Sequence, residues 1–292
     1  MPAGQPDLTV IDELTYSDSD HVRFYEHPPA VSKPGLRSWY ARGQHFVVEY
    51  SEVDGGCELS RTGQPDEHLL LLPDAGTTAR IHAGGETLDS AGQRLVAIPP
   101  GDSTIQVDGS GRVVRLLTSR ATDLADLAVN AASYSEPHQN LAPLKPWPDP
   151  VGGWQLRDYD LTVPPMASPR FRLYRCTTFM INYTAGRMGP RKGVGLSPHS
   201  HDDFEQCSLV LSGTWVHHLR WPWTGDPETW RTDEHERCEA PSVTVIPAGV
   251  VHTSQPIGNG FNHLVDIFAP PRADYSANPG WVFNAEDYPL PS

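Results

Sequence analysis

The chain has 292 residues, of which 38 % are apolar and 20 % are charged, so it can bury a sizeable core and is not globally disordered. Its formal charge of −14 disfavours nucleic acid and anionic membranes as general partners. The opening MPAGQPDLTVIDEL has no basic or apolar leader pattern, and no run approaches the ~18 apolar residues of a membrane span. We therefore expect a soluble, cytoplasmic protein whose partner is a small-molecule substrate, with a homodimer left open.

Short apolar runs recur along the whole chain and predict an all-β fold. They are HFVVEY, HLLLLP, RLVAIPP and VVRLLTS, followed by FRLYRCTTFMINY, CSLVLSG, SVTVIPAG and HLVDIFAP. Most are bounded by Gly, Pro or Asp, as strands are. Residues 121–132 give the one good helical pattern, and the Pro-rich segment after them indicates a linker that ends near residue 153.

The two sides of this linker resemble each other. IPPGDST at 98–104 matches IPAGVVH at 246–252, an offset of 148, and GTTARIH from Gly76 matches GTWVHHL from Gly213, an offset of 137. The difference of eleven is accounted for by an insertion in the second half, WPWTGDPETWR at 221–231. This order of matches predicts a duplicated unit.

Four cysteines, Cys57, Cys176, Cys207 and Cys238, stand far apart without C-x-x-C spacing. Neither a zinc ribbon nor a disulfide framework is indicated, and we expect free thiols.

A cluster of potential metal ligands lies in the second half, in SPHSHDDFEQ at 197–206. His199 and His201 point to one face if the segment is a strand, and Glu205 can face the same way after a short turn. His252, in PAGVVH, follows a turn shaped by Pro247 and Gly249 that can return it to the same place. A polar loop that happens to contain histidine is the alternative. Three imidazoles and a carboxylate suit Fe(II), Mn(II), Ni(II), Cu(II) or Zn(II) better than Ca(II).

The combination resembles the cupin superfamily, whose first motif reads G-x5-H-x-H-x3-4-E-x6-G and whose second reads G-x5-P-x-G-x2-H-x3-N. The first motif maps onto His199, His201, Glu205 and Gly213, with one extra residue before the glycine. The second maps onto Pro247, Gly249 and His252, with Pro241 and Pro256 replacing its first Gly and last Asn. The resemblance implies two tandem antiparallel jelly-roll barrels, a bicupin, with His199, His201, Glu205 and His252 holding one divalent metal ion.

The first half keeps the pattern of strands without the ligands. Thr104 stands where His252 stands, Glu67 is the partner of Glu205, and the two remaining histidines fall on Arg61 and Gly63. We therefore expect a degenerate barrel over 41–120, after an arm over 1–40, and one metal ion per chain. The metal-binding barrel is expected over 154–270, followed by a tail over 271–292.

Further candidate site residues surround the motif. Arg187 and Arg191 can form a cationic rim for a substrate carboxylate or phosphate, although a solvated loop is the alternative. His217, His263 and Tyr183 are candidate catalytic groups, with buried structural histidines as the alternative for the first two. The tryptophans in and beside the insertion can cover the site or close the barrel end; these are Trp215, Trp221, Trp223 and Trp230.

From these features we expect a mononuclear non-haem metal enzyme, a dioxygenase acting on a small carbonyl, phenolic or carboxylate substrate with Fe(II) as the favoured ion. Mn(II), Ni(II) and Zn(II) are alternatives. A redox-neutral isomerase, epimerase or lyase that uses the metal to polarise a carbonyl is the second hypothesis. A non-catalytic metal- and ligand-binding bicupin is the third.

Overall fold

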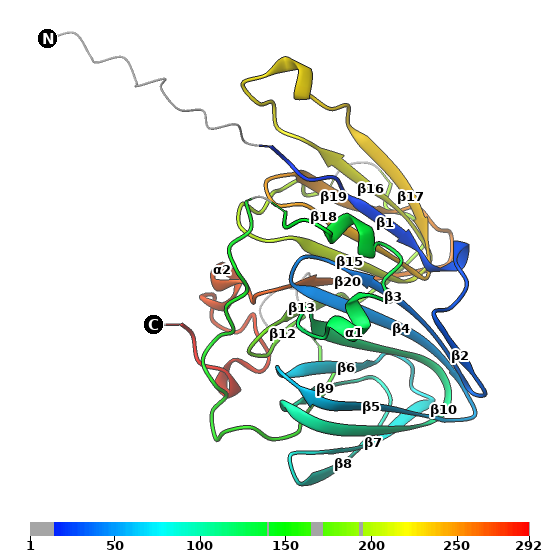
Figure 1. Ribbon diagram of the computed structural model, residues 1–292. Helices are drawn as coiled ribbons and strands as arrows, with labels where there is room; N and C mark the ends of the chain where they lie inside the picture. Colours follow the sequence, from blue (N-terminus) through cyan, green and yellow to red (C-terminus); the bar gives the residue numbers. More distant parts are fainter. Residues whose placement is uncertain (1–14, 139, 165–171, 193–194, 292) are drawn as a thin grey trace, which may run out of the picture.

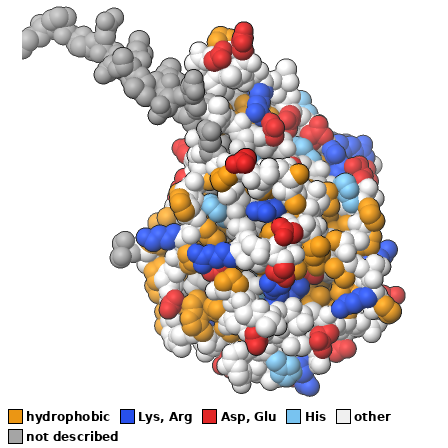
Figure 2. Space-filling model, in the orientation of Figure 1, with side chains coloured by type: hydrophobic (Ala, Val, Ile, Leu, Met, Phe, Trp, Pro, Cys, Tyr) orange, Lys and Arg blue, Asp and Glu red, His pale blue; other side chains and the backbone are white. Residues whose placement is uncertain are grey.

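The computed structural model describes residues 15–138, 140–164, 172–192 and 195–291, and it is built mainly from antiparallel strands in two halves (Figure 1). Among these residues no helix is long and apolar enough to cross a bilayer. Acidic and basic side chains are interspersed over the face shown in Figure 2. The four cysteines carry free thiols, as expected.

One half is formed by a ten-stranded sheet with the order β11-β9-β6-β10-β4-β3-β2, to which β5, β7 and β8 are joined through β10 and β7. Its strands are β2 Val31–Lys33, β3 Leu36–Arg42, β4 Phe46–Asp54, β5 Cys57–Gln64, β6 His68–Leu72, β7 Thr77–Ala83, β8 Glu86–Ser90, β9 Arg94–Ile98, β10 Gly101–Thr118 and β11 Arg157–Asp160.

The other half is formed by a sheet with the order β1-β18-β15-β20-β13-β12, with β14 paired to β20, and by a three-stranded sheet β17-β16-β19. Its strands are β1 Asp20–Arg23, β12 Leu173–Arg175, β13 Met180–Tyr183, β14 Arg187–Met188, β15 Gln206–Ser212, β16 Thr214–Arg220, β17 Glu234–Glu239, β18 Ser242–Ile246, β19 Val251–Pro256 and β20 Phe261–Phe268.

Helices are few and short among the described residues. The stretch 121–132, expected to be helical, forms only one α-helical turn, and a 3-10 turn begins at its end. Ala121 and Asn130 make no side-chain capping bond for these turns, and the helices gain little from local interactions. The helical elements are η1 Phe24–Glu26, α1 Thr122–Ala125, η2 Ala131–Tyr134, η3 Pro227–Thr229, α2 Ala273–Ser276 and η4 Ala285–Asp287.

The two halves exchange their first strands. β1, which precedes the first half in the chain, pairs with β18 of the second, and β11, which follows the linker, pairs with β9 of the first. Figure 1 shows β1, in blue, beside strands of the C-terminal half. The expected arm over 1–40 therefore contains β1, β2 and most of β3, and the expected boundary near residue 153 falls before a strand that belongs to the first barrel.

The predicted duplication agrees with the strand pairing. Thr104 lies opposite His82, whereas His252 lies opposite Leu219, and these pairs are related by the two offsets found in the sequence. The insertion at 221–231 lies in the β16–β17 connection, where the first half has only Gly84 and Gly85 between β7 and β8. Both halves are thus built on one plan, and equivalent positions can be compared directly.

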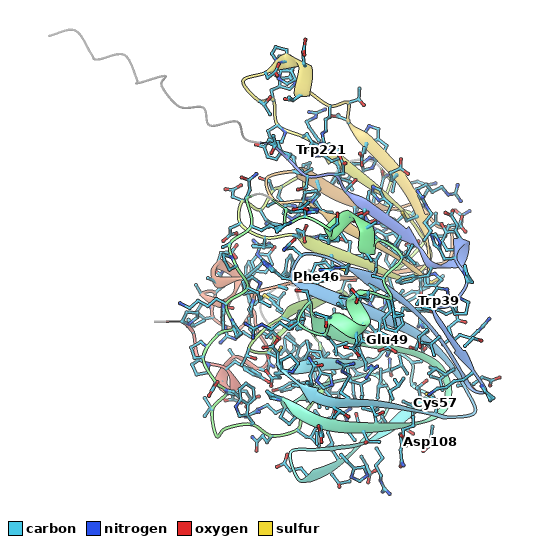
Figure 3. The ribbon with its side chains drawn as sticks, viewed as in Figure 1. Trp39, Phe46, Glu49, Cys57, Asp108 and Trp221 are labelled. Carbon is cyan, nitrogen blue, oxygen red and sulfur yellow. The ribbon has the colours of Figure 1, made fainter. Side chains whose placement is uncertain are left out.

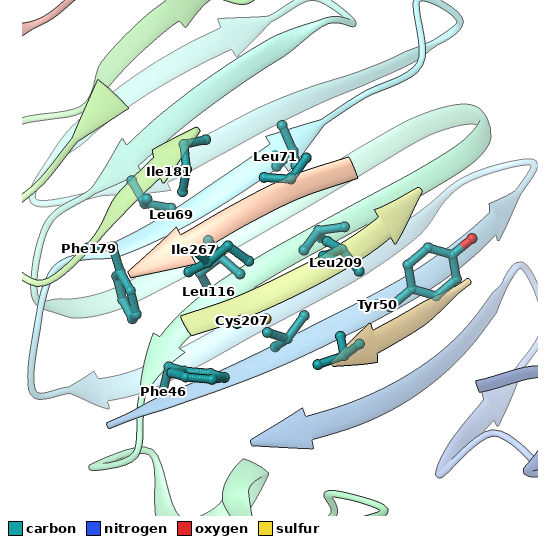
Figure 4. Close-up of a cluster of buried hydrophobic side chains, with 14 of the residues drawn as sticks. Phe46, Tyr50, Leu69, Leu71, Leu116, Phe179, Ile181, Cys207, Leu209 and Ile267 are labelled. Atoms are coloured by element: carbon teal, nitrogen blue, oxygen red, sulfur yellow. The ribbon is translucent and has the colours of Figure 1, made fainter. Parts of the chain in front are cut away.

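The largest apolar cluster lies between the two barrels and takes side chains from both (Figure 4). Phe46, Leu69 and Leu116 come from the first half, and Phe179 and Leu209 come from the second. All five are buried, and full burial of one such side chain contributes about 1.5–3 kcal/mol. One face of β15 and of β20 is committed to this cluster, which leaves the other face of each strand to line the interior of the second barrel.

Candidate metal centre

Three histidines of the second barrel converge. A backbone bridge joins His199 to His252 on β19, with N–H···O distances of 3.1 and 2.8 Å. Gly249, at a φ of +78°, donates its N–H to the carbonyl of His201 at 2.6 Å and ties the turn before β19 to the first motif. The potential ligand atoms of His199, His201 and His252 lie within 4.8 Å of one another. The structure brings together the three histidines that the sequence motif indicated.

Backbone carbonyls orient two of these rings. His199 donates Nδ1–H to the carbonyl of Ser197 at 2.7 Å, and His252 donates Nδ1–H to the carbonyl of Val250 at 2.9 Å. In a neutral ring the other nitrogen then carries the lone pair. Nε2 of both histidines is therefore in the form that a metal ion binds.

Gln206, the first residue of β15, faces the same point. Its Oε1 lies 3.0 Å from Nε2 of His201 and 3.2 Å from Nε2 of His252. Its amide nitrogen donates to Ser208 Oγ at 3.2 Å and to Asp266 Oδ1 at 3.0 Å, which turns the amide oxygen toward the histidines. The amide of Gln206 thus presents an acceptor to the histidine cluster.

This arrangement of acceptors fits a bound cation. Burial lowers the pKa of His252 to about 4, so at neutral pH its Nε2 carries a lone pair that faces the lone pairs of Gln206 Oε1. Burial and the neighbouring Arg272 lower the pKa of His201 to about 2, so this ring is also neutral. Because Nη1 of Arg272 can only donate, its contact with Nε2 of His201 assigns the lone pair to that nitrogen. Ligand atoms at about 2.1 Å from one ion are about 3 Å apart at right angles, close to the two observed separations. The residues present therefore fit a divalent transition metal with three nitrogen donors and one amide oxygen.

Glu205, expected as the fourth ligand, lies outside this cluster. Gln206 faces the barrel interior, so its neighbour in the chain points to the opposite side, toward the first barrel. The Glu205 carboxylate accepts the backbone N–H of Gln44 at 2.6 Å and a ring N–H of His138 at 2.7 Å. These contacts use the carboxylate between the barrels, and we correct the prediction for this residue.

The sequence contains a signal for this correction. The family motif allows three or four residues between its second histidine and its acidic residue. Four residues separate His201 from Gln206, so Gln206 also satisfies this spacing. Counting from Gln206, six residues precede Gly213, so the irregular spacing noted for Glu205 disappears. The alignment on Gln206 was not considered because the family motif has an acidic residue at this position.

A cavity of about 340 Å³ opens from the cluster to the surface. Arg187 and Arg191, expected at a cationic rim, both line it, and Trp215 and Leu264 contribute apolar wall. His199, His252 and Gln206 also line it. The cavity therefore combines three of the candidate ligands with an apolar wall and two arginines.

Asp266, a single acidic residue within the apolar strand β20, also lines this cavity. Its Oδ1 accepts from Ser208 at 2.9 Å and from Gln206 at 3.0 Å. Burial raises the pKa of Asp266 to about 6. No prediction from the sequence included Asp266, although an acidic residue within the apolar run HLVDIFAP was a visible signal.

Arg272 approaches the cluster from the C-terminal segment. Its Nη1 donates to Nε2 of His201 at 3.3 Å, and its Nε donates to Asp274 at 3.0 Å. The guanidinium carbon lies 3.5 Å from the ring centroid of Tyr275 and 5.2 Å from that of Phe268. This buried cation beside a candidate ligand had no signal in the sequence.

The three residues expected to be catalytic lie away from the cavity wall. Tyr183 and His263 stack edge to face at 4.6 Å on the side of β13 and β20 that packs against the first barrel, and His263 Nε2 contacts the carbonyl of Thr184. His217 is fully buried in the second barrel, with Nδ1 2.9 Å from Ser254 Oγ. Both faces of β20 are apolar, so alternation could not assign the face of His263. The described lining of this cavity includes none of the three, and a catalytic role for them stays a prediction.

The tryptophans divide between the cavity and the insertion. Trp221 is buried and packs at the start of the β16–β17 connection (Figure 3). Trp223 and Trp230 stack on each other at 4.5 Å near its tip, and both are exposed. Of the four expected around the site, Trp215 is the one found among the described residues that line the cavity.

The first barrel has a different interior at the equivalent position. His68 takes the place of Gln206, and Glu49 (labelled in Figure 3) forms a buried ion pair with Arg115 at 2.6 Å between Nε and Oε2. Arg61, at the position of His199, binds Asp123 through both terminal nitrogens. Among the described residues, one group of three or more His, Cys, Asp or Glu side chains is close enough to share an ion. This group lies in the second barrel.

No protein-family model and no curated protein sequence matches the chain. Its fold is similar to that of AerE from Microcystis aeruginosa, with a TM-score of 0.53 and 9 % identity over 88 % of this chain and 99 % of AerE. A structure of Bacillus subtilis oxalate decarboxylase that concerns its Mn(II) centres gives a TM-score of 0.58 and 13 % identity over 92 % of this chain and 83 % of that one. Another, on the substrate-binding mode of oxalate decarboxylase, gives 0.58 and 14 % over the same shares.

The two antiparallel barrels and these matches show a bicupin fold, as the motifs predicted.

Proposed function

We propose that the protein is a metal-dependent enzyme that carries out a redox-neutral reaction, a decarboxylation, isomerisation or elimination, on a small carbonyl or carboxylate compound. The observation that carries this proposal is the convergence of Nε2 of His201 and His252 on Gln206 Oε1, beside a cavity that Asp266 also lines. His199, His201, His252 and Gln206 would hold the ion.

A bound divalent ion would supply Lewis acidity, polarising a substrate oxygen and stabilising negative charge that develops next to it. All four donors are uncharged, so the protein would leave the full charge of the ion available for this purpose. The same neutral donors favour the lower oxidation state of the ion. This feature favours redox-neutral chemistry over the dioxygenase that the sequence analysis placed first.

The remaining groups of the cavity would bind the substrate and move a proton. Arg187 and Arg191 would orient a carboxylate from the rim, and Trp215 would exclude water from one side. Asp266 is the carboxyl group on the cavity wall that could take a proton from one substrate atom and return it to another. The similarity to oxalate decarboxylase is consistent with a small carboxylate substrate. Fe(II), Mn(II), Ni(II) and Zn(II) all suit the donors.

The test is a screen of metal-loaded protein with small keto acids, hydroxy acids and dicarboxylates, run with and without dioxygen. We expect turnover under anaerobic conditions that is lost with a chelator and in Asp266→Asn. Turnover that consumes dioxygen in proportion to product would instead support the dioxygenase hypothesis. Tight binding of a metal and of an anion without any turnover would favour the non-catalytic bicupin.

A further inference from the structure

We infer that the centre binds a divalent metal ion and a small anion cooperatively. Gln206 brings no negative charge to balance that of the ion, and Arg272 adds a second positive charge beside it. The inference rests on the proposed function for the location of the metal, and it concerns the charge of the ligand that completes the site. An anionic substrate group would act as part of the metal's binding site.

The four candidate donors are all neutral. Gln206 replaces a carboxylate at the position that faces the histidines, and the acidic neighbour Glu205 is turned away to the first barrel. A carboxylate ligand would neutralise half of the charge of a divalent ion, whereas an amide oxygen neutralises none. An anion from solution or from the substrate is then the available source of compensating charge.

Arg272 places a positive charge beside one of the candidate ligands. Its side chain is 8 % exposed, and Nη1 donates to Nε2 of His201 at 3.3 Å. An ion bound to His201 takes that lone pair, so Nη1–H loses its acceptor and its charge faces the ion. An anion beside the ion would accept from Nη1 and lie between two positive charges. Without the anion, the guanidinium opposes binding of the metal.

Contacts on several sides hold the Arg272 guanidinium in place. Asp274 binds its Nε and Nη2, and the aromatic rings of Tyr275 and Phe268 lie against it at 3.5 and 5.2 Å. The Asp274 side chain is 62 % exposed, so water screens the charge it offers to the buried end of Arg272. The arginine is therefore a fixed cation at this point.

Among the described residues that line the cavity, Asp266 is the one acidic group. It already accepts hydrogen bonds from Gln206 and Ser208. Arg187 and Arg191 add positive charge nearer to the surface. The cavity is thus suited to a ligand with one negative group at the metal and a second negative or polar group at the rim, such as a small dicarboxylate or keto acid.

The experiment uses Co²⁺ and azide as probes on the full chain. Co²⁺ affinity is measured by competition with a chromophoric chelator, with and without azide, and the visible spectrum of the bound Co²⁺ reports azide entering its coordination shell. We expect azide to tighten Co²⁺ binding by about tenfold or more, within the usual range of coupling between sites. By linkage, Co²⁺ must tighten azide binding by the same factor.

Substitutions at Gln206 and Arg272 test the cause. Gln206→Glu should bind Co²⁺ more tightly without azide and lose most of the coupling. Arg272→Met should show the same two changes, whereas Arg272→Lys, which keeps the charge, should retain a larger part of the coupling. Arg220→Met is the matched control, because that arginine of the same barrel is exposed and paired with Asp233. Circular dichroism of each variant checks the fold.

Failure of the inference can be told from failure of the proposed function. Absence of stoichiometric Co²⁺ binding to the wild-type protein would overturn the metal centre itself. Co²⁺ binding that is indifferent to azide, or coupling that survives unchanged in both Gln206→Glu and Arg272→Met, would overturn this inference and leave the metal centre in place.

Discussion

Glu67 and Glu205 occupy equivalent positions in the two halves, and each accepts a backbone N–H from the opposite barrel. Glu205, just before β15, accepts from Gln44 at 2.6 Å, and Glu67, just before β6, accepts from Thr177 at 2.9 Å. The equivalence predicted from the sequence is therefore real, but the shared role is to join the barrels.

A third group completes each contact. His138, in the linker, donates to Glu205 at 2.7 Å, and the hydroxyl of Tyr288, in the C-terminal segment, donates to Glu67 at 2.8 Å. The duplication thus preserved both carboxylates and placed a different partner on each. The predictions below separate this joining role from metal binding.

Glu205→Gln should lower the free energy of unfolding by about 1–3 kcal/mol, because a buried carboxylate loses charge-assisted bonds to Gln44 and His138. Its metal content should stay at the wild-type level. Urea denaturation of the metal-free protein and elemental analysis of the metal-loaded protein measure the two effects. Glu67→Gln is the matched control and should behave alike. Loss of metal without loss of stability in Glu205→Gln would restore this residue as a ligand.

The protein should bind about one transition-metal ion per chain, because the three-histidine cluster lies in the second barrel. His252→Ala should lose most of this metal and keep the β-sheet circular dichroism spectrum. Thr104→Ala, the equivalent change in the first barrel, should leave the metal content unchanged. A stoichiometry near two, measured by elemental analysis, would show that the first barrel also binds metal.

The contact between His138 and Glu205 should make stability depend on pH. The hydrogen bond that His138 donates to Glu205 raises the pKa of His138 above its usual 6.5, with Asp20 adding to the effect. A raised pKa in the folded state means that this stabilisation is fully present below about pH 6.5 and is lost as the pH rises through the folded-state value.

His138→Gln should therefore destabilise the protein more at pH 5.5 than at pH 8.5. Urea denaturation of both proteins at the two pH values gives this difference, in which the contributions of other titrating groups largely cancel. A penalty that is equal at both pH values would mean that the charge of His138 adds nothing.

The buried pair Glu49–Arg115 in the first barrel should be costly to break from one side. The two side chains are 1 % and 5 % exposed, so Arg115→Met leaves a carboxylate without its counter-charge and should cost about 3–5 kcal/mol. The double variant Glu49→Leu with Arg115→Met should recover part of this loss. Denaturant unfolding of the wild type, both single variants and the double variant completes this double-mutant cycle. A double variant that is less stable than Arg115→Met would contradict the argument.

The sequence predicts the fold and the histidines well because both are encoded locally. His199, His201 and His252 lie in short motifs whose turns and spacing are visible in the chain, and the strand runs match the observed strands. The choice between Glu205 and Gln206 depends on how the 202–205 turn enters β15, and one residue of difference reverses the face.

Contacts between distant segments could not be predicted in this way. Arg272 reaches His201 from the C-terminal segment, and β1 reaches β18 across most of the chain. Both depend on the packing of the two barrels, for which one sequence carries no local pattern. The same holds for His263, whose strand is buried on both faces.

The pairing of β1 with β18 also sets the order in which the molecule can be completed. During synthesis β1, which ends at residue 23, appears before every other described strand, yet its partner β18 starts at residue 242. The barrel that carries the histidines therefore cannot close until β18 has been made, and until then β1 has no partner strand. Pairing over such a separation in sequence slows folding, and a bare edge invites association with other chains. Removing residues 1–23, or producing the C-terminal half alone, should therefore yield a protein that aggregates although every metal ligand is present.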